Sequence, residues 1–141
     1  MYAVIRIRGL VNVPREVRDT LKMLRLTRVN HCVVIPKTPD YDGMLRKVSS
    51  YITWGELSQE TLEKLVAKRG RLPGDGKLDS KKAKEVSGKI LKARSSRDSE
   101  IKPVFRLSPP SKGYKSIRMA YPRGDLGNRG EGINQLLKRM I

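Results

Sequence analysis

The sequence predicts a mixed fold in which strands and helices alternate up to residue 57, in the order strand, helix, strand, helix, strand. Residues 31–35 are an apolar run too rich in β-branched side chains for a surface segment, and we expect them to form the most buried strand. Apolar residues recur at helical spacing on either side of this run, over residues 17–24 and again over residues 44–52, although the second helix must give way near Ser49 and Ser50. Each of these spacings predicts an amphipathic helix.

The first strand is predicted over residues 2–8, where side chains alternate between two faces. The odd positions are apolar and are expected to pack, whereas the even positions, which include Arg6 and Arg8, are expected to face outward. Asn12 is the expected cap of the first helix, ahead of Pro14 in its first turn.

A loop stiffened by proline follows the buried strand. Pro36 and Pro39 bracket Lys37 and Thr38, fix their own φ angles and disfavour helix just before each proline. A loop held in this way loses less entropy when it binds a partner. Asp40 is then the expected cap of the second helix.

The third strand is predicted over residues 51–54, which are rich in strand formers. Beyond it, Ser58 is expected to cap a helix that Gly70 ends. A further helix is predicted from about residue 79 to 94, with a narrow apolar side and a lysine-rich outer face, and a serine-rich hinge over 95–99.

The last forty residues predict a hairpin and a terminal helix. Residues 104–107 and 117–121 both alternate, and residues 109–113 between them are rich in turn formers. The predicted organisation is therefore a strand-helix core over residues 1–57, a basic helical extension over 58–100, and a hairpin with a helix that packs on the core over 101–141.

The net charge of the chain is the clearest indication of its partner. The 141 residues hold 31 Lys and Arg against 14 Asp and Glu, a net charge of +17. Such an excess repels itself unless a polyanion supplies the opposite charge, which predicts a nucleic-acid partner. No apolar run approaches the roughly 18–20 residues of a membrane span, so we expect no membrane partner. The only cysteine, Cys32, excludes a disulfide within the chain and favours a reducing compartment.

Catalytic and metal chemistry find little support in the sequence. The only histidine, His31, precedes the only cysteine, and adjacent strand residues point to opposite faces. Asp40 and Asp42 are better explained as helix starts. We expect no enzyme activity, no cofactor, no metal and no small-molecule substrate. Residues 124–132 match no nucleotide-binding pattern, although their amides and Arg129 would suit an RNA phosphate; the alternative is a tight turn only.

The RNA-binding candidates are basic side chains for phosphates, polar side chains for sugars or phosphates, and one tyrosine for base stacking. Each basic residue taken alone fits a solvated surface position as well, and Asn30 and Thr38 equally suit turns. The candidates are Arg6, Arg8, Thr27, Arg28, Asn30, Lys37, Thr38, Tyr41, Lys47, Arg106, Lys112, Lys115, Arg118, Asn128 and Arg129.

Several stretches resemble the L-thirty family of the large ribosomal subunit. They are IRIRG (5–9), VRDTLKMLRLTRVNHCVVIPKTPDYDGMLRKV (17–48) and YITWGEL (51–57). Bacterial members look like residues 1–57 alone. FRLSPP (105–110) and GDLGNRGEGINQLLKRM (124–140) resemble the longer archaeal and eukaryotic branch, called L-seven-like in eukaryotes. Because the chain has no long basic N-terminal extension, the resemblance favours an archaeal source.

The resemblance implies an α+β fold whose β-α-β-α-β core has an antiparallel sheet related to the ferredoxin-like plait. It also implies a structural constituent of the large subunit that binds large-subunit rRNA. The further partners that it implies are 5S rRNA and neighbouring ribosomal proteins, on a ribosome in the cytoplasm. Two alternatives stay open: an architectural DNA- or RNA-binding protein outside the ribosome, which would bind any duplex equally, and a small RNA-processing enzyme, which would need a convergent acid, base or metal cluster.

Overall fold

Strand β1 (Tyr2–Arg6) lies between two partners in the sheet of the computed structural model, which describes residues 1–93 and 100–141. It pairs antiparallel with β2 (His31–Ile35) and with β3 (Ile52–Glu56). Beyond these, β4 (Val104–Arg106) pairs antiparallel with β2 and the short β5 (Gly127–Asn128) pairs parallel with β3. The order of the described strands is β4-β2-β1-β3-β5. The predicted order of the core and its antiparallel sheet are confirmed.

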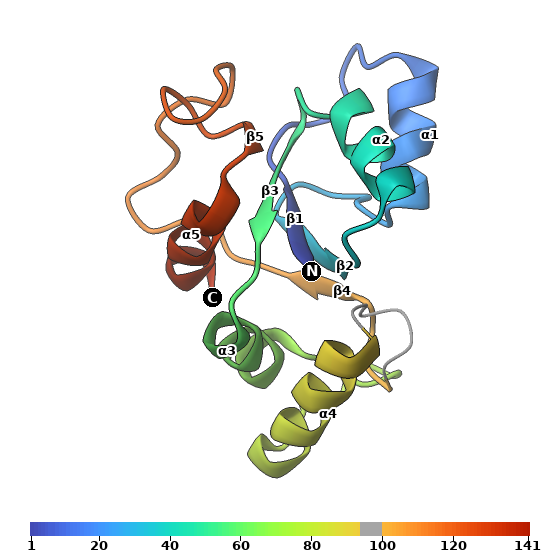
Figure 1. The fold of residues 1–141 in the computed structure, drawn as a ribbon, viewed down its shortest axis with the longest axis vertical. Coiled ribbons are helices and arrows are strands. Elements are labelled where there is room, and N and C mark those ends of the chain that lie inside the picture. The colour runs from blue at the N-terminus through green and yellow to red at the C-terminus, as the bar shows by residue number, and fades with distance from the viewer. Residues whose placement is uncertain (94–99) are drawn as a thin grey trace.

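Helices cover both faces of this sheet (Figure 1). On one face lie α1 (Arg15–Met23) and α2 (Pro39–Lys47), which connect the three core strands. On the other lie α3 (Gln59–Arg69), α4 (Ser80–Ala93) and α5 (Ile133–Met140), preceded by the short 3-10 turn η1 (Gly130–Gly132). The chain thus forms three layers, with the sheet in the middle.

The core is divided by the sheet into two clusters. Val4, Val33 and Trp54 pack with the α1 and α2 layer, whereas Ala3 and Cys32 pack with the opposite layer. All five residues of β1 are buried. The expectation that even positions of this strand face outward is therefore wrong, because both faces of β1 are covered by helices. Complete burial also raises the pKa of the Cys32 thiol to about 12.

The helix starts differ slightly from the predicted ones. Pro14, not Asn12, is the residue before α1, and Asn12 has a left-handed backbone with φ 54°. Pro39 opens α2 after Thr38, so Asp40 lies inside the first turn, where its charge suits the helix dipole. Ser58 caps α3 as expected, its Oγ accepting a hydrogen bond from the Thr61 amide at 3.4 Å.

The predicted C-terminal hairpin is wrong. Strand β4 forms, but it pairs with β2, with Phe105 opposite Cys32, because Phe105 is buried there against the open edge of β2. Residues 117–121 do not form a strand. The turn-rich stretch 109–113 instead bonds to the end of α5, where the Ser111 amide donates to the Arg139 carbonyl at 3.0 Å. The terminal helix itself is confirmed.

The helix predicted from residue 79 to 94 is α4, which packs on α3 through Ala83, Val86 and Ile90. Its lysines at 81, 82, 84, 89 and 92 are exposed, so the predicted basic outer face is present. The hinge predicted over 95–99 lies outside the described residues. In the part of the chain that the structure describes, no helix has the length and apolar character of a membrane span.

A substitution at Gly55 of β3 tests how closely the sheet approaches η1. A Cβ at this position would lie 2.1 Å from the Gly130 carbonyl oxygen, so we expect Gly55→Ala to lower the free energy of unfolding by about 3 kcal/mol. Gly43→Ala is the control, since nothing lies within 4 Å of its would-be Cβ and alanine favours the helix by up to about 1 kcal/mol. Urea unfolding measures both, and equal stability of Gly55→Ala and wild type would contradict this close approach.

Candidate nucleic-acid interface

Arg6 lies inside the protein rather than on its surface. Its side chain is 2% exposed, and Nη1 donates to the carbonyl oxygens of Leu26 and Thr27 at 2.9 and 2.7 Å, while Nε donates to the Arg8 carbonyl at 2.9 Å. Burial lowers the pKa of this guanidinium. The expectation of an outward Arg6 is corrected: its planar fork satisfies carbonyl groups that would otherwise be unpaired, and so it fixes the loop between α1 and β2.

That loop contains two residues with left-handed backbone, Arg25 with φ 60° and Asn30 with φ 64°. Asn30 is a structural junction: its carbonyl accepts from the Leu107 amide at 3.1 Å and its Oδ1 accepts from the Tyr114 hydroxyl at 2.9 Å. Burial raises the pKa of Tyr114 to about 12. With its base held in this way, the loop presents the exposed Arg28 to solvent.

A group of arginines gathers at β4, which is the edge strand on its side of the described sheet. Arg106 is exposed and lies opposite His31 in the register, and burial together with Arg106 and Arg28 lowers the pKa of His31. Next to Arg106, a hollow of about 360 Å³ is lined by Arg69, Arg71, Asp75 and Arg106. We call Arg28, Arg71 and Arg106 the edge cluster.

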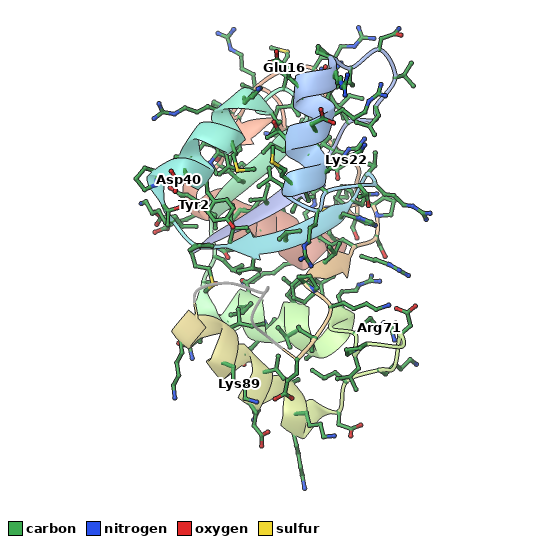
Figure 2. All side chains as sticks on the ribbon, turned by 90° about the vertical axis from the view of Figure 1, so that its right-hand side faces the viewer. Tyr2, Glu16, Lys22, Asp40, Arg71 and Lys89 are labelled. Carbon is green, nitrogen blue, oxygen red and sulfur yellow. The ribbon has the colours of Figure 1, made fainter. Side chains whose placement is uncertain are left out.

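Arg71 was not among the sequence candidates, and neither was Arg69. Arg69 is partly occupied, since Nη2 donates to Ser108 Oγ at 2.6 Å and to the Ile141 carbonyl at 3.1 Å. No pattern in the sequence distinguishes Arg71 from its basic neighbours, because its position depends on where β4 pairs. Figure 2 shows Arg71 and Lys22 on the same side of the molecule, with the end of β4 between them.

The proline-flanked loop lies away from the edge cluster. Lys37 Nζ pairs with Glu56 Oε1 at 3.0 Å and lies 5.6 Å from the centre of the Tyr2 ring. The hydrogen bond to Glu56 is the main cause of the raised pKa of Lys37. In Figure 2, Tyr2 and Asp40 mark this loop on the opposite side from Arg71. Lys37 and Arg106 therefore belong to different surfaces.

Other candidates of the core lie near α1 and α2. Lys47 pairs with Glu16 at 3.1 Å and so joins the two helices, and the Arg8 guanidinium lies 5.1 Å from the centre of the Tyr51 ring. Tyr41 is half-buried on α2. Thr38 precedes α2 and its side chain makes no cap hydrogen bond, whereas Thr27 Oγ1 lies 3.4 Å from His31 Nδ1.

Arg129 is the second candidate that is buried. Its side chain is 8% exposed and forms an ion pair with Asp125, and the guanidinium lies 5.2 Å from the centre of the Tyr121 ring. Its Nε has no hydrogen-bond partner among the described residues. The interpretation of Arg129 as a surface phosphate ligand is therefore corrected, because Asp125 already neutralises its charge inside the protein. Asn128 is exposed, and its Oδ1 accepts from the Gly130 amide at 2.8 Å.

The remaining candidates, Lys112, Lys115 and Arg118, are exposed on the long segment between β4 and β5. Across the described residues, no group of three or more His, Cys, Asp or Glu side chains gathers as a metal site would require. The fold and its surface thus define a basic scaffold protein. Its exposed cations are carried on a rigid sheet and on the loops that leave it.

Comparison with known proteins agrees with this class. Residues 2–52 match the family model described as ribosomal protein L30p/L7e. A protein of Archaeoglobus fulgidus named large ribosomal subunit protein uL30 is 48% identical over 151 residues, covering 99% of both chains. Proteins of the same name from Methanosphaera stadtmanae and Methanobrevibacter smithii are 46% and 43% identical over 152 residues, covering 100% of both chains.

The chain belongs to the L30p/L7e family of ribosomal proteins. The resemblance stated from the sequence is confirmed, and the relatives named above are archaeal. Membership of this family makes the role structural and not enzymatic, and it places the protein on the ribosome, in the cytoplasm.

Arg6 provides a test of the internal framework. Arg6→Met removes every donor to Leu26, Thr27 and Arg8, so we expect the free energy of unfolding to fall by about 3 kcal/mol. Arg6→Lys keeps the charge but not the fork and should recover only part of this loss. Arg106→Met is the control, and since Arg106 is exposed its effect should stay within about 0.5 kcal/mol. Equal urea midpoints for Arg6→Met and Arg106→Met would show that Arg6 does not hold the loop.

Proposed function

We propose that this protein binds folded rRNA of the large ribosomal subunit and stabilises its tertiary structure, with neighbouring ribosomal proteins and 5S rRNA as further partners. The observation that carries this proposal is the edge cluster, in which the exposed Arg28 and Arg106 and the half-buried Arg71 gather at an edge strand. Arg71 and Arg106 line a hollow there together with Arg69 and Asp75. The planar guanidinium group of arginine can donate two hydrogen bonds to the oxygens of one phosphate. Each phosphate that is neutralised also releases counterions, which favours binding.

Basic residues also lie on other sides of the molecule. Helix α4 with its lysines lies at the lower end of Figure 2, where Lys89 is labelled. Lys37 lies 5.6 Å from the centre of the Tyr2 ring, and Figure 2 labels Tyr2 well away from Lys89. Lys112, Lys115 and Arg118 lie on the segment that leaves the body at the upper left of Figure 1. A protein with separate basic surfaces contacts more than one RNA segment, and a rigid sheet between them fixes how those segments lie relative to one another.

The roles proposed for the candidates follow from their positions. Arg6, Asn30 and Arg129 act as positioning residues, because their polar groups are engaged inside the protein. The remaining candidates stay proposed RNA contacts, and Arg71 joins them. They are Arg8, Thr27, Arg28, Lys37, Thr38, Tyr41, Lys47, Arg106, Lys112, Lys115, Arg118 and Asn128. We expect specificity to come from RNA shape and 2′-hydroxyl groups rather than from base readout in a duplex.

Sedimentation of a native cell lysate tests the proposed function directly. The lysate is run through sucrose gradients at moderate and at high salt, and this protein is detected in the fractions. We expect it to migrate with large subunits at moderate salt. Recovery at the top of the gradient, or together with DNA, would overturn the proposal and favour an architectural DNA-binding protein.

The edge cluster predicts a change in the salt dependence of binding. For Arg106→Ala and for Arg28→Ala, the slope of log affinity against log salt concentration for large-subunit rRNA should decrease by about one unit each. Arg15→Ala is the control: Arg15 is also exposed, lies within 3.8 Å of Asp19, and stands beside Glu16 at the top of Figure 2, away from Arg71. Its slope should not change.

The same measurement decides the role of the proline-flanked loop. Lys37→Ala should weaken binding and flatten the slope by up to about one unit if its ammonium meets a phosphate in place of Glu56. An unchanged slope would remove Lys37 from the interface. If Arg28→Ala, Arg106→Ala and Lys37→Ala all bound with the wild-type slope, phosphate contacts at these three positions would be excluded.

A further inference from the structure

The segment between β4 and β5, residues 107–126, exposes three large apolar side chains and buries its one carboxylate. We call it the β4–β5 loop; it leaves the body of the protein in Figure 1 before returning to the sheet. Ile117, Met119 and Tyr121 are each 45% exposed, whereas Asp125 is only 4% exposed. A loop that meets only water is expected to show the opposite arrangement, with its carboxylate outside and its large apolar side chains covered.

This exposure does not come from a loop without internal structure. The buried Asp125 accepts a hydrogen bond from the Lys115 amide and forms the ion pair with Arg129. Backbone hydrogen bonds close the loop at several further points, including Gly124 to Ala120 at 2.8 Å and Asp125 to Ser116 at 2.9 Å. The loop therefore holds its apolar side chains in place before any partner binds, which lowers the entropy cost of binding.

Close packing reinforces this geometry. A Cβ at Gly124 would lie 2.1 Å from the Met119 carbonyl oxygen, so the chain can turn here only with glycine. The Tyr121 ring lies over the Arg129 guanidinium, and a Cβ at Gly132 would come within 3.4 Å of the Tyr121 hydroxyl oxygen. One side of the Tyr121 ring therefore contacts the protein, and the remainder of the ring is exposed to solvent.

The charge around these side chains indicates what covers them. Between Lys112 and Gly124 the sequence contains no acidic residue, while Lys112, Lys115, Arg118 and Arg123 are all exposed. The partner is therefore an anion that also offers apolar faces. Unpaired RNA bases meet both requirements, since every base has a face for stacking and every nucleotide carries a phosphate.

We infer that the β4–β5 loop binds unpaired bases of the RNA, with Ile117, Met119 and Tyr121 against the bases and Lys115, Arg118 and Arg123 on the neighbouring phosphates. This inference rests on the proposed function, because it names the part of the RNA that one surface recognises. It differs from the edge cluster, which is rich in cations but has no comparable group of exposed apolar side chains among the described residues.

Two variants of the full chain separate the base contacts from the phosphate contacts. Ile117→Ser/Met119→Ser replaces two side chains that are nearly half exposed and lie outside the two core clusters, so the fold should persist. The Kd for large-subunit rRNA transcribed in vitro should rise about tenfold. Its salt slope should not change. Lys115→Ala/Arg118→Ala/Arg123→Ala should instead lower the salt slope by about two to three units. Val11→Ser is the matched control, because Val11 is 87% exposed on another loop.

Chemical probing of the same RNA with dimethyl sulfate identifies the bases. We expect a set of unpaired bases that wild type protects and that Ile117→Ser/Met119→Ser leaves reactive, with the Val11→Ser pattern equal to wild type. Unchanged Kd and unchanged protection in Ile117→Ser/Met119→Ser, while wild type still binds, would overturn this inference but not the proposed function. Failure of wild type to bind the RNA at all would overturn both.

Discussion

Burial of β1 on both faces is the constraint on which the rest of the structure depends. Its five residues are covered by helices above and below, and β2 and β3 occupy both of its edges. A strand buried in this way needs a helical layer on each face of the sheet. The two layers are formed one after the other along the chain. The layer of α1 and α2 comes from the connections within the core, and the layer of α3, α4 and α5 comes from the residues after β3.

Buried arginines connect this framework to the surface. Arg6 fixes the loop that presents Arg28, and Arg129 holds Asp125 and Tyr121 at the base of the β4–β5 loop. In both places a guanidinium inside the protein positions a segment whose exposed cations lie further out. The strong positive charge thus has two uses, since a few cations determine the shape of the surface and the others give it its charge.

The core could be predicted from the sequence because its signals are local. The apolar run at residues 31–35 forms β2, the helical spacing before it lies on α1, and Ser58 caps α3, all as expected. The spacing after the run is helical only as far as Lys47, where α2 ends. The partner of β4 could not be predicted in this way. Alternation shows that residues 104–107 suit a strand, but only the packing of Phe105 beside Cys32 decides between β2 and residues 117–121.

The candidate site was harder to predict than the fold, for a physical reason. An arginine in the sequence shows its charge but not its burial, and burial depends on whether unpaired carbonyl groups lie nearby. The left-handed turn at Arg25 leaves the Leu26 and Thr27 carbonyls for Arg6, which no spacing rule indicates. The sequence did identify Arg28 and Arg106 as candidates, but their closeness depends on the pairing of His31 with Arg106.

The division of the two helical layers along the chain has a consequence for synthesis. Residues up to β3 leave the ribosome first, and they already hold the three central strands and the layer of α1 and α2. The opposite face, with Ala3, Ile5, Cys32 and Val34, is completed only when α5 packs against it. A nascent chain therefore carries a half-covered, aggregation-prone sheet until α3, α4 and α5 have all been synthesised and have folded onto it.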